Sequence, residues 1–273
     1  MQWVNWEKFY KKITIKLRID PDGDFEAAKT LQSYFHERLE QVQLQRMRLK
    51  ELCRKPCVVF GAGPSLSSDL SECLQAELLS SCTTIAADGA TSEFIRRNII
   101  PHIIVTDLDG DMNHISAAAR GGSILIIHGH GDNKERITEW VPLLLEFDPI
   151  PTTQVEPIPP LENFGGFSDG DRAAFMAVEC GCTTLALAGF DLGEVVGRSS
   201  KPEISRDIIA SPRKRIKLEI ATELLQELRK KESLNEKMFF YTFTAKSAAY
   251  LEGYTPISPQ EFVRFIHSSE NGQ

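Results

Sequence analysis

The stretch that decides the fold class is Ile103-Ile104-Val105-Thr106-Asp107-Leu108-Asp109-Gly110-Asp111. A short, continuous apolar run ends there in acids at alternate positions, and the residues from Met112 to Arg120 then have the pattern of a helix. Continuous apolar strands are typical of a parallel sheet that is covered by helices on both faces. In such sheets a ligand binds at the carboxyl ends of the strands, so the acids stand where function is expected.

The same alternation of short apolar strands and helices runs outward from this stretch in both directions. We predict strands over Cys57–Phe60, Thr83–Ala87, Ile103–Thr106, Ile124–Ile127, Thr183–Ala188 and Phe239–Thr244. Helices are predicted over Ser67–Leu79, Ser92–Asn98, Met112–Arg120, Lys134–Leu145, Asp169–Cys180 and Arg213–Lys231. The predicted fold class is α/β, a doubly wound, mostly parallel, Rossmann-like sheet.

Residues 1–50 differ in pattern and predict an α-rich amino-terminal appendage to an α/β domain over residues 51–273. After a turn cluster at residues 20–24, one long amphipathic helix is expected from Phe25 to Lys50. Residues 147–160 hold five prolines and are expected to form an extended connection. Ser258, followed by Pro259 and by Glu261 three residues after the cap, predicts a short terminal helix through Phe265.

Composition limits the class of protein. The chain has 273 residues, of which 42% are hydrophobic and 25% charged, which is ordinary for a globular protein. A net charge of −7 argues against binding a nucleic-acid backbone. No apolar run could span a membrane, and the first residues lack a secretory signal, so we expect a cytoplasmic protein without a membrane partner. The composition leaves open whether the chain forms a homo-oligomer.

The spacing of the six cysteines matches neither a zinc ribbon nor a disulfide framework. We predict reduced thiols in the core, where cysteine behaves as a small apolar residue. They are Cys53, Cys57, Cys73, Cys82, Cys180 and Cys182.

The loop after the first strand, with Gly61, Gly63 and Ser65, is a candidate for binding phosphate. Glycines let the backbone approach an anion, and the amino terminus of the next helix favours negative charge. The loop lacks the last glycine of the dinucleotide fingerprint and the Lys of a Walker A motif. A tight turn without a ligand explains it equally well.

The acids Asp107, Asp109 and Asp111 would repel one another unless a cation neutralised them. We favour Mg²⁺ on Asp107 and Asp109, because this ion prefers oxygen ligands together with substrate phosphates. The segment does not match the calcium loop of an EF-hand, because the twelfth position counted from Asp107 is Ala118, where a bidentate Glu is needed. Asp111 is explained as well by capping of the next helix. Asp88, which closes the second strand, is assigned to the same metal site, although ribose binding and helix capping are alternatives.

The loop from His128 to Asp132 carries two imidazoles in a glycine-rich segment. A zinc site would be short of ligands, because no third histidine lies nearby. We expect Asp132 and one imidazole, assigned to His128, to lie near phosphate or metal. The other histidine is then structural.

The segment Gly165-Gly166-Phe167-Ser168-Asp169-Gly170-Asp171-Arg172 is the most specific of the polar loops. Arg172 lies in the first turn of the following helix and is assigned to phosphate, because arginine binds phosphate oxygens in a bidentate fork. Ordinary helix capping beside an exposed arginine is the alternative.

Together these loops resemble the archaeal 6-hydroxymethyl-7,8-dihydropterin pyrophosphokinases, a family related to the catalytic domain of thiamine pyrophosphokinase. The similarity rests on residues 88–90, 106–111, 128–133 and 165–172, in preserved order, and covers about Cys57 to Gly193. It implies Mg²⁺-dependent transfer of diphosphate from ATP to a reduced hydroxymethylpterin, with release of AMP, for a methanopterin or folate-type carrier.

The resemblance also implies roles for residues. Asp88, Asp107 and Asp109 would hold the metal, and Asp132 would join them or accept the hydroxyl proton. Asp169 or Asp171 would pair with the donor-rich pterin edge, while Phe167 or Phe164 stacks on the ring. Gly110-Asp111 and the GGFSDGD segment depart from the thiamine enzymes, which leaves the residues at the substrate edge open.

Two other functions compete with this one. A metal-dependent nucleotide-sugar glycosyltransferase would also use an acidic loop to bind a metal and a diphosphate. A non-catalytic nucleotide-binding module would still bind ATP after the loss of Asp107 and Asp109.

Overall fold

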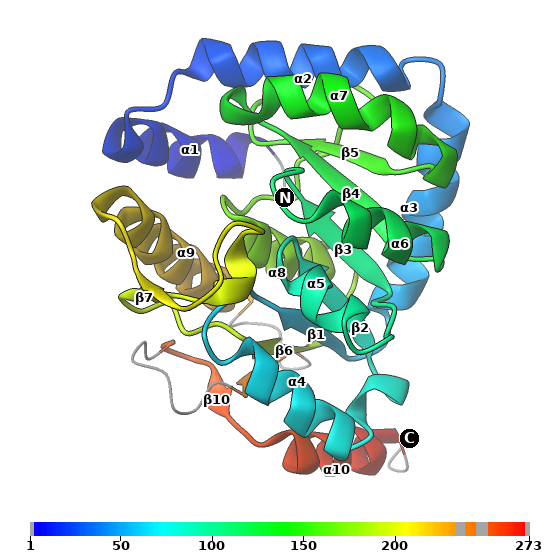
Figure 1. Ribbon diagram of the computed structural model, residues 1–273, viewed down its shortest axis with the longest axis vertical. Helices are drawn as coiled ribbons and strands as arrows, with labels where there is room; N and C mark the ends of the chain where they lie inside the picture. The colour runs from blue at the N-terminus through cyan, green and yellow to red at the C-terminus, as the bar shows by residue number, and fades with distance from the viewer. Residues whose placement is uncertain (1–2, 233–237, 244–250, 271–273) are drawn as a thin grey trace.

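The computed structural model describes residues 3–232, 238–243 and 251–270, and an eight-stranded sheet runs through it (Figure 1). Its strands are β1 (Cys57–Phe60), β2 (Thr83–Ala87), β3 (Ile103–Thr106), β4 (Ile124–Gly129), β5 (Ile150–Thr153), β6 (Thr184–Ala188), β9 (Phe239–Thr242) and β10 (Thr255–Pro256). The spatial order is β10-β9-β6-β1-β2-β3-β4-β5, and each neighbouring pair is parallel. The chain builds outward from β1 to β5 and then returns to β6 on the other side of β1. The strand order therefore reverses at β1, which confirms the doubly wound prediction.

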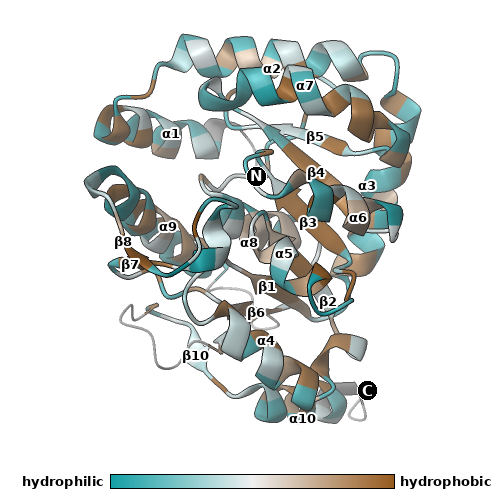
Figure 2. Cartoon of the chain, in the orientation of Figure 1, coloured by the Kyte–Doolittle hydropathy of each residue, from teal (hydrophilic) through white to brown (hydrophobic). Residues whose placement is uncertain are grey.

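Helices cover both faces of this sheet, because its strands are apolar on both sides (Figure 2). In β1, Cys57 and Val59 belong to one hydrophobic cluster, and Val58 and Phe60 belong to the other. The helices are α4 (Leu66–Gln75), α5 (Ala90–Ile95), α6 (Met112–Arg120), α7 (Lys134–Leu144), α8 (Asp169–Glu179), α9 (Pro212–Lys231) and α10 (Pro259–Glu270). Buried residues of α4, α5 and α10 join the second cluster, and those of α8 and α9 join the first.

Short elements complete the described chain. Four 3-10 turns are η1 (Leu78–Ser80), η2 (Gly131–Asn133), η3 (Leu145–Phe147) and η4 (Arg198–Ser200). A separate antiparallel ribbon pairs β7 (Val195–Val196) with β8 (Ile208–Ile209).

The single long helix predicted over residues 25–50 is wrong. The segment forms α2 (Pro21–Phe35) and α3 (Leu39–Cys53), and α1 (Trp3–Leu17) precedes them. Neither Gly nor Pro marks the break, and packing decides it: α2 lies against α7 and β5, and α3 lies against β5 (Figure 1). The expected turn cluster is the start of α2, where the Asp20 side chain accepts a hydrogen bond from the Asp22 N–H. The division into residues 1–50 and 51–273 stays a prediction.

The extended connection predicted over residues 147–160 contains strand β5. Pro151 obscured this strand, but β5 is an edge strand, where proline is tolerated. The other predicted strands agree with the structure to within two residues, except that Thr244 lies outside the described residues. The terminal helix starts at the predicted capping box and runs further than predicted, to Glu270.

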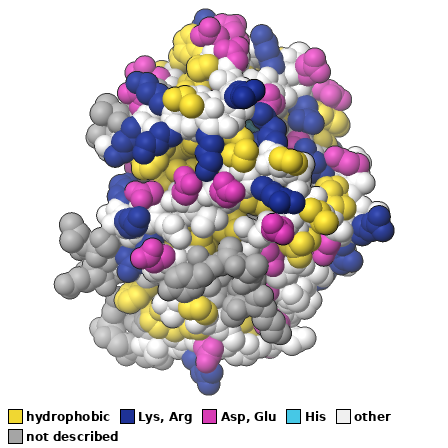
Figure 3. Space-filling model, turned by 90° about the vertical axis from the view of Figure 1, so that its left-hand side faces the viewer, with side chains coloured by type: hydrophobic (Ala, Val, Ile, Leu, Met, Phe, Trp, Pro, Cys, Tyr) yellow, Lys and Arg dark blue, Asp and Glu magenta, His cyan; other side chains and the backbone are white. Residues whose placement is uncertain are grey.

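All six cysteines are free and buried, as predicted. No helix among the described residues is both long and apolar enough to cross a membrane. On the face in Figure 3, acidic and basic side chains lie intermixed over the upper part of the molecule.

Candidate active site at the carboxyl ends of the strands

Three acids meet at the carboxyl edge of the sheet. Asp88 follows β2, whereas Asp107 and Asp109 follow β3, and the two strands pair in parallel with Ala87 opposite Val105. One carboxylate oxygen from each acid lies within 4.8 Å of the others. The structure thus brings together the three residues that the sequence assigned to the metal.

The backbone around these acids is held in a tight arrangement. Thr106 Oγ1 donates a hydrogen bond to Asp88 and accepts one of 2.8 Å from the Leu108 N–H. Leu108 has a φ of 65° and Asp88 a φ of 39°, a left-handed conformation that is uncommon for leucine and more accessible to aspartate. A Cβ on Gly110 would lie 2.7 Å from Asp88 Oδ2, so only glycine lets this loop approach Asp88.

Several buried carboxylate oxygens at this edge have no hydrogen-bond partner among the described residues. They are Asp88 Oδ2, Asp107 Oδ1 and Asp169 Oδ1. Burial raises the pKa of Asp88 well above its usual range, and the charges of Asp169 and Asp107 raise it further. Buried, unpaired carboxylates of this kind are costly without a cation. The donor set consists of oxygens, so the three acids can bind a hard divalent metal ion.

Cationic side chains partly balance this charge. Lys201 Nζ lies 2.9 Å from Asp109 Oδ2. Burial acts to raise the pKa of Asp107, but the hydrogen bond and charge of His130 outweigh it, and the pKa falls below its usual value. His130 Nε2 lies 3.1 Å from Asp107 Oδ2.

His130, and not His128, is therefore the imidazole beside the acids. His128 is fully buried, and its Nδ1 lies 3.1 Å from Thr152 Oγ1. Burial lowers the pKa of His128 well below its usual value, which favours the neutral ring. The predicted contact between His128 and phosphate has no support in this geometry, because the ring does not reach the surface.

The Asp132 side chain is 73% exposed, and its ionic partner is Arg213, at 3.9 Å. The loop around it is held instead by Asn133. The Asn133 side-chain amide donates hydrogen bonds of 2.7 Å to the carbonyls of Asp107 and His128. Asn133 thereby ties the histidine loop to the acidic loop, a role that the sequence did not reveal.

Asp24 of α2 is a second residue that the sequence analysis missed. Its buried carboxylate accepts three hydrogen bonds of 2.7 Å, from the Gly131 N–H, the Gln154 amide and the Tyr10 hydroxyl. The cap formed by Asp20 and Pro21 marked the helix start and could have indicated that Asp24 lies in a first turn. The contact with Gly131 could not be read from the sequence.

In the GGFSDGDR segment, Asp171 and Arg172 hold the loop together. Asp171 accepts hydrogen bonds from the N–H groups of Phe167, at 2.6 Å, and Ser168, at 2.9 Å. Arg172 is buried and donates to the carbonyls of Phe167, at 2.9 Å, and Gly166, at 3.4 Å. Neither side chain is therefore placed as predicted for a ligand, because both are engaged within the protein.

Asp169 is the acid of this segment that keeps a buried oxygen without a hydrogen bond. Its nearest cation is Arg172, with Nη1 at 4.0 Å from Oδ1. Burial, and next the charge of Asp107, raise the pKa of Asp169 well above its usual range. Phe167, two residues before it, is half-buried, and Lys217 Nζ lies 5.8 Å from the centre of the Phe167 ring.

The predicted phosphate loop after β1 is closed by the protein itself. The Ser65 N–H and hydroxyl each lie 3.0 Å from Asp191 Oδ2, and the Gly63 N–H donates to the Gly189 carbonyl at 2.9 Å. The Gly61 N–H donates to Ala188. A phosphate on this loop would have to displace the Asp191 carboxylate. The geometry fits the tight turn that the sequence left as the alternative.

Fold and site together define a doubly wound α/β protein with a cluster of acids at its strand ends whose oxygens can hold a divalent cation. The chain belongs to the 6-hydroxymethylpterin diphosphokinase MptE-like family, whose model matches residues 28–197. This confirms the resemblance inferred from the polar loops, and the chain is an enzyme of the diphosphotransferase class.

Three curated relatives carry the name 6-hydroxymethyl-7,8-dihydropterin pyrophosphokinase. The protein from Methanothermobacter thermautotrophicus is 39% identical and covers 82% of this chain and 93% of its own length. The relatives from Pyrococcus furiosus and Methanocaldococcus jannaschii are 37% and 36% identical, covering 84% and 85% of this chain and 95% and 97% of their own. A solved MAf glycosyltransferase from Magnetospirillum magneticum has a TM-score of 0.49 and 13% sequence identity, over 85% of this chain and 42% of its own length.

Proposed function

We propose that this chain transfers a diphosphoryl group from ATP to 6-hydroxymethyl-7,8-dihydropterin with the help of Mg²⁺. The products are the pterin diphosphate and AMP, and the reaction serves a methanopterin or folate-type carrier in the cytoplasm. The observation that carries the proposal is the convergence of Asp88, Asp107 and Asp109 in a chain of this family, where Asp88 and Asp107 each keep a buried oxygen without a hydrogen bond. The names of the curated relatives support the choice of pterin as the acceptor.

The chemistry needs positioning and charge neutralisation more than a reactive side chain. The hydroxymethyl oxygen forms a bond to the β-phosphorus, the bond from that phosphorus to the α,β-bridging oxygen breaks, and AMP leaves. Asp88, Asp107 and Asp109 would hold Mg²⁺, which neutralises phosphate charge during the transfer. His130 fixes one of these carboxylates, because its Nε2 lies 3.1 Å from Asp107 Oδ2.

The acceptor side of the site is built by the start of α8. Asp169 keeps an unpaired oxygen for the amino and ring N–H donors of a pterin, and the half-buried ring of Phe167 offers a stacking surface. Asp171 is not assigned to the pterin, because its carboxylate caps α8. Asp132 remains the predicted acceptor of the hydroxyl proton, but no contact in the structure supports that role.

Product identification tests the proposal. The full chain is incubated with ATP, Mg²⁺ and the reduced hydroxymethylpterin, with EDTA and no-pterin controls, and the nucleotides are separated. AMP and pterin diphosphate that appear only with metal and pterin support it. ADP would identify an ordinary kinase instead. No turnover by a folded, ATP-binding chain would favour the non-catalytic module.

A further inference from the structure

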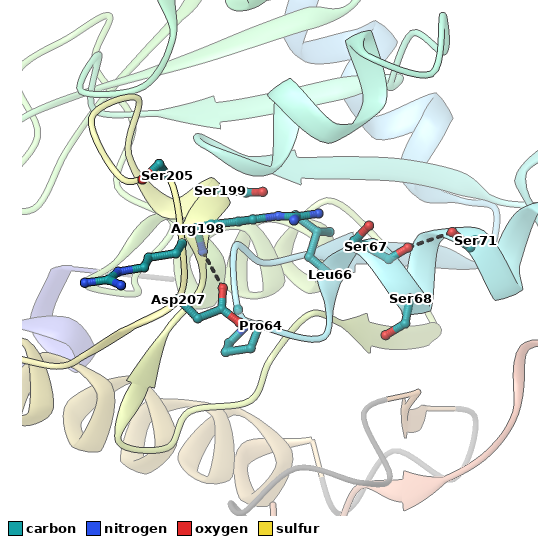
Figure 4. Close-up of a pocket in the computed structure, with 11 residues that line it drawn as sticks. Pro64, Leu66, Ser67, Ser68, Ser71, Arg198, Ser199, Ser205 and Asp207 are labelled. Carbon is teal, nitrogen blue, oxygen red and sulfur yellow. Dashed lines mark hydrogen bonds between the residues drawn. The ribbon is translucent and has the colours of Figure 1, made fainter.

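A cavity of about 540 Å³ opens beside the start of α4, on the same edge of the sheet as the acids. Figure 4 shows Pro64, Leu66 and the serines of α4 on one side of it. The segment of residues 198–207 forms the other side, with Arg198, Arg206 and Asp207. This volume falls in the range of roughly 300–1,000 Å³ that is typical of small-molecule pockets.

The segment 198–201 connects this cavity to the acidic site. Arg198 and Ser199 line the cavity and also a smaller hollow that includes Arg96 and Lys201. Lys201 Nζ in turn lies 2.9 Å from Asp109 Oδ2. The cavity and the hollow therefore share Arg198 and Ser199, and Lys201 lies between the hollow and the acids.

The same segment is anchored beside Asp88. The Ser199 hydroxyl donates a hydrogen bond of 3.1 Å to Glu93 Oε1, which is buried at the start of α5. The backbone of Gly89 approaches the Ser199 and Ser200 carbonyls so closely that a Cβ would lie 3.0 Å from the latter. The position of Arg198 relative to the metal-binding acids is thus set by contacts on the β2 side.

Charge favours an anion in the cavity, because Arg198 and Arg206 line it and have no ionic partner among the described residues. In the hollow, by contrast, Arg96 pairs with Glu93 at 3.3 Å and Lys201 pairs with Asp109 at 2.9 Å, and Asp111 adds a negative charge. The Asp207 carboxylate at the cavity accepts a hydrogen bond of 2.8 Å from the Arg198 N–H. Guanidinium groups bind phosphate in preference to neutral heterocycles. A pterin is neutral, and its candidate partners Phe167 and Asp169 are on the α8 side.

We propose that this cavity binds the nucleoside monophosphate end of the donor, with Arg198 at the α-phosphate and Arg206 near the ribose and base. The inference rests on the proposed function and divides the site into two sides. The AMP leaving group lies between α4 and residues 198–207, the transferred phosphates lie toward the acids, and the pterin approaches from α8.

Titration calorimetry with AMP, adenosine and inorganic phosphate tests this on the full chain, without metal or pterin. Arg198→Ala and Arg206→Ala are suitable, because both side chains are exposed and their loss leaves the core intact. We expect each to weaken AMP binding by at least about tenfold, with partial recovery in Arg198→Lys. Arg120→Ala removes the same charge at the far end of α6, away from the strand ends, and should bind AMP like the wild type.

Steady-state kinetics gives the second readout. The KM for ATP should rise at least about tenfold in the Arg198 and Arg206 alanine variants, with the KM for pterin unchanged within about twofold. Unchanged AMP affinity in both variants would overturn the proposal. So would a rise in the pterin KM alone, or inorganic phosphate binding as tightly as AMP.

The outcomes separate this proposal from the proposed function. AMP binding that depends on Arg198, in a chain without diphosphoryl transfer, supports the cavity assignment and rejects the reaction. Diphosphoryl transfer with AMP affinity unchanged in both variants supports the proposed reaction and rejects the cavity assignment.

Discussion

The carboxylate of Asp24 accepts a hydrogen bond of 2.7 Å from the backbone N–H of Gly131, which lies 107 residues further along the chain. Gly131 follows His130, the imidazole that contacts Asp107. A helix of the amino-terminal segment thus positions a loop of the candidate active site. Gly131 suits this contact, because a Cβ there would lie 3.1 Å from the Gly23 backbone.

Asp24→Ala should lower the free energy of unfolding by about 3 kcal/mol or more, because it leaves buried donors of Gly131, Gln154 and Tyr10 unpaired. Urea denaturation measures the change. Asp22→Ala removes an exposed acid from the same helix turn and is the control. Equal stability of the two variants would mean that the Asp24 hydrogen bonds contribute little.

Asp107→Asn and Asp109→Asn should each lower kcat by at least about a hundredfold, because each removes a negative ligand from the proposed metal site. Circular dichroism should show that both remain folded. Asp148→Asn makes the same change before β5, where the residue has a φ of 49° that asparagine adopts readily, and should leave kcat unaltered. Wild-type rates in both site variants would reject the metal assignment.

Gly110→Ala should reduce turnover by at least about tenfold at low Mg²⁺, because the added Cβ would lie 2.7 Å from Asp88 Oδ2 and force the acids apart. The Mg²⁺ concentration for half-maximal rate is the measurement, and it should rise. Gly23→Ala adds a Cβ in α2 at ordinary contact distance, 3.6 Å from Asp20, and should behave like the wild type. An unchanged Mg²⁺ requirement in Gly110→Ala would contradict the prediction.

Arg172→Ala should destabilise the fold by about 2 kcal/mol or more and raise the KM for pterin more than the KM for ATP. The reason is that Arg172 holds the carbonyls of Gly166 and Phe167, beside the proposed pterin site. Thermal melts and the two KM values test this. A selective rise in the KM for ATP would return Arg172 to the phosphate role assigned from the sequence.

Stability should fall with acid through His128. Burial depresses the pKa of His128 in the folded chain, so below the unfolded value of about 6.5 the unfolded chain binds a proton that the folded chain does not. The free energy of unfolding should therefore decrease by up to about 1.4 kcal/mol per pH unit below that value. This slope should shrink in His128→Gln and persist in His36→Gln, which changes an exposed ring. Equal slopes in all three proteins would show that His128 does not carry the effect.

The α/β class was predictable because buried parallel strands are continuous apolar runs, and β1, β2 and β3 match their predicted bounds. The break between α2 and α3 was not predictable, because helix propensity continues through residues 36–38 and only packing ends α2. Strand β5 was missed because Pro151 is unfavourable in a central strand, and nothing local shows that this strand is an edge.

The sequence by itself determined that acids follow adjacent strands, because parallel strands end at one edge, and this brought Asp88, Asp107 and Asp109 together. Only the tertiary structure decided which polar side chains remain free. Asp171, Arg172 and Ser65 are residue types that commonly bind ligands, yet each forms hydrogen bonds within the protein instead. His130 took the position assigned to His128, and Asp24 reached the site from α2. Hydrogen bonds between distant segments depend on how the whole chain packs, and the local sequence pattern does not determine that packing.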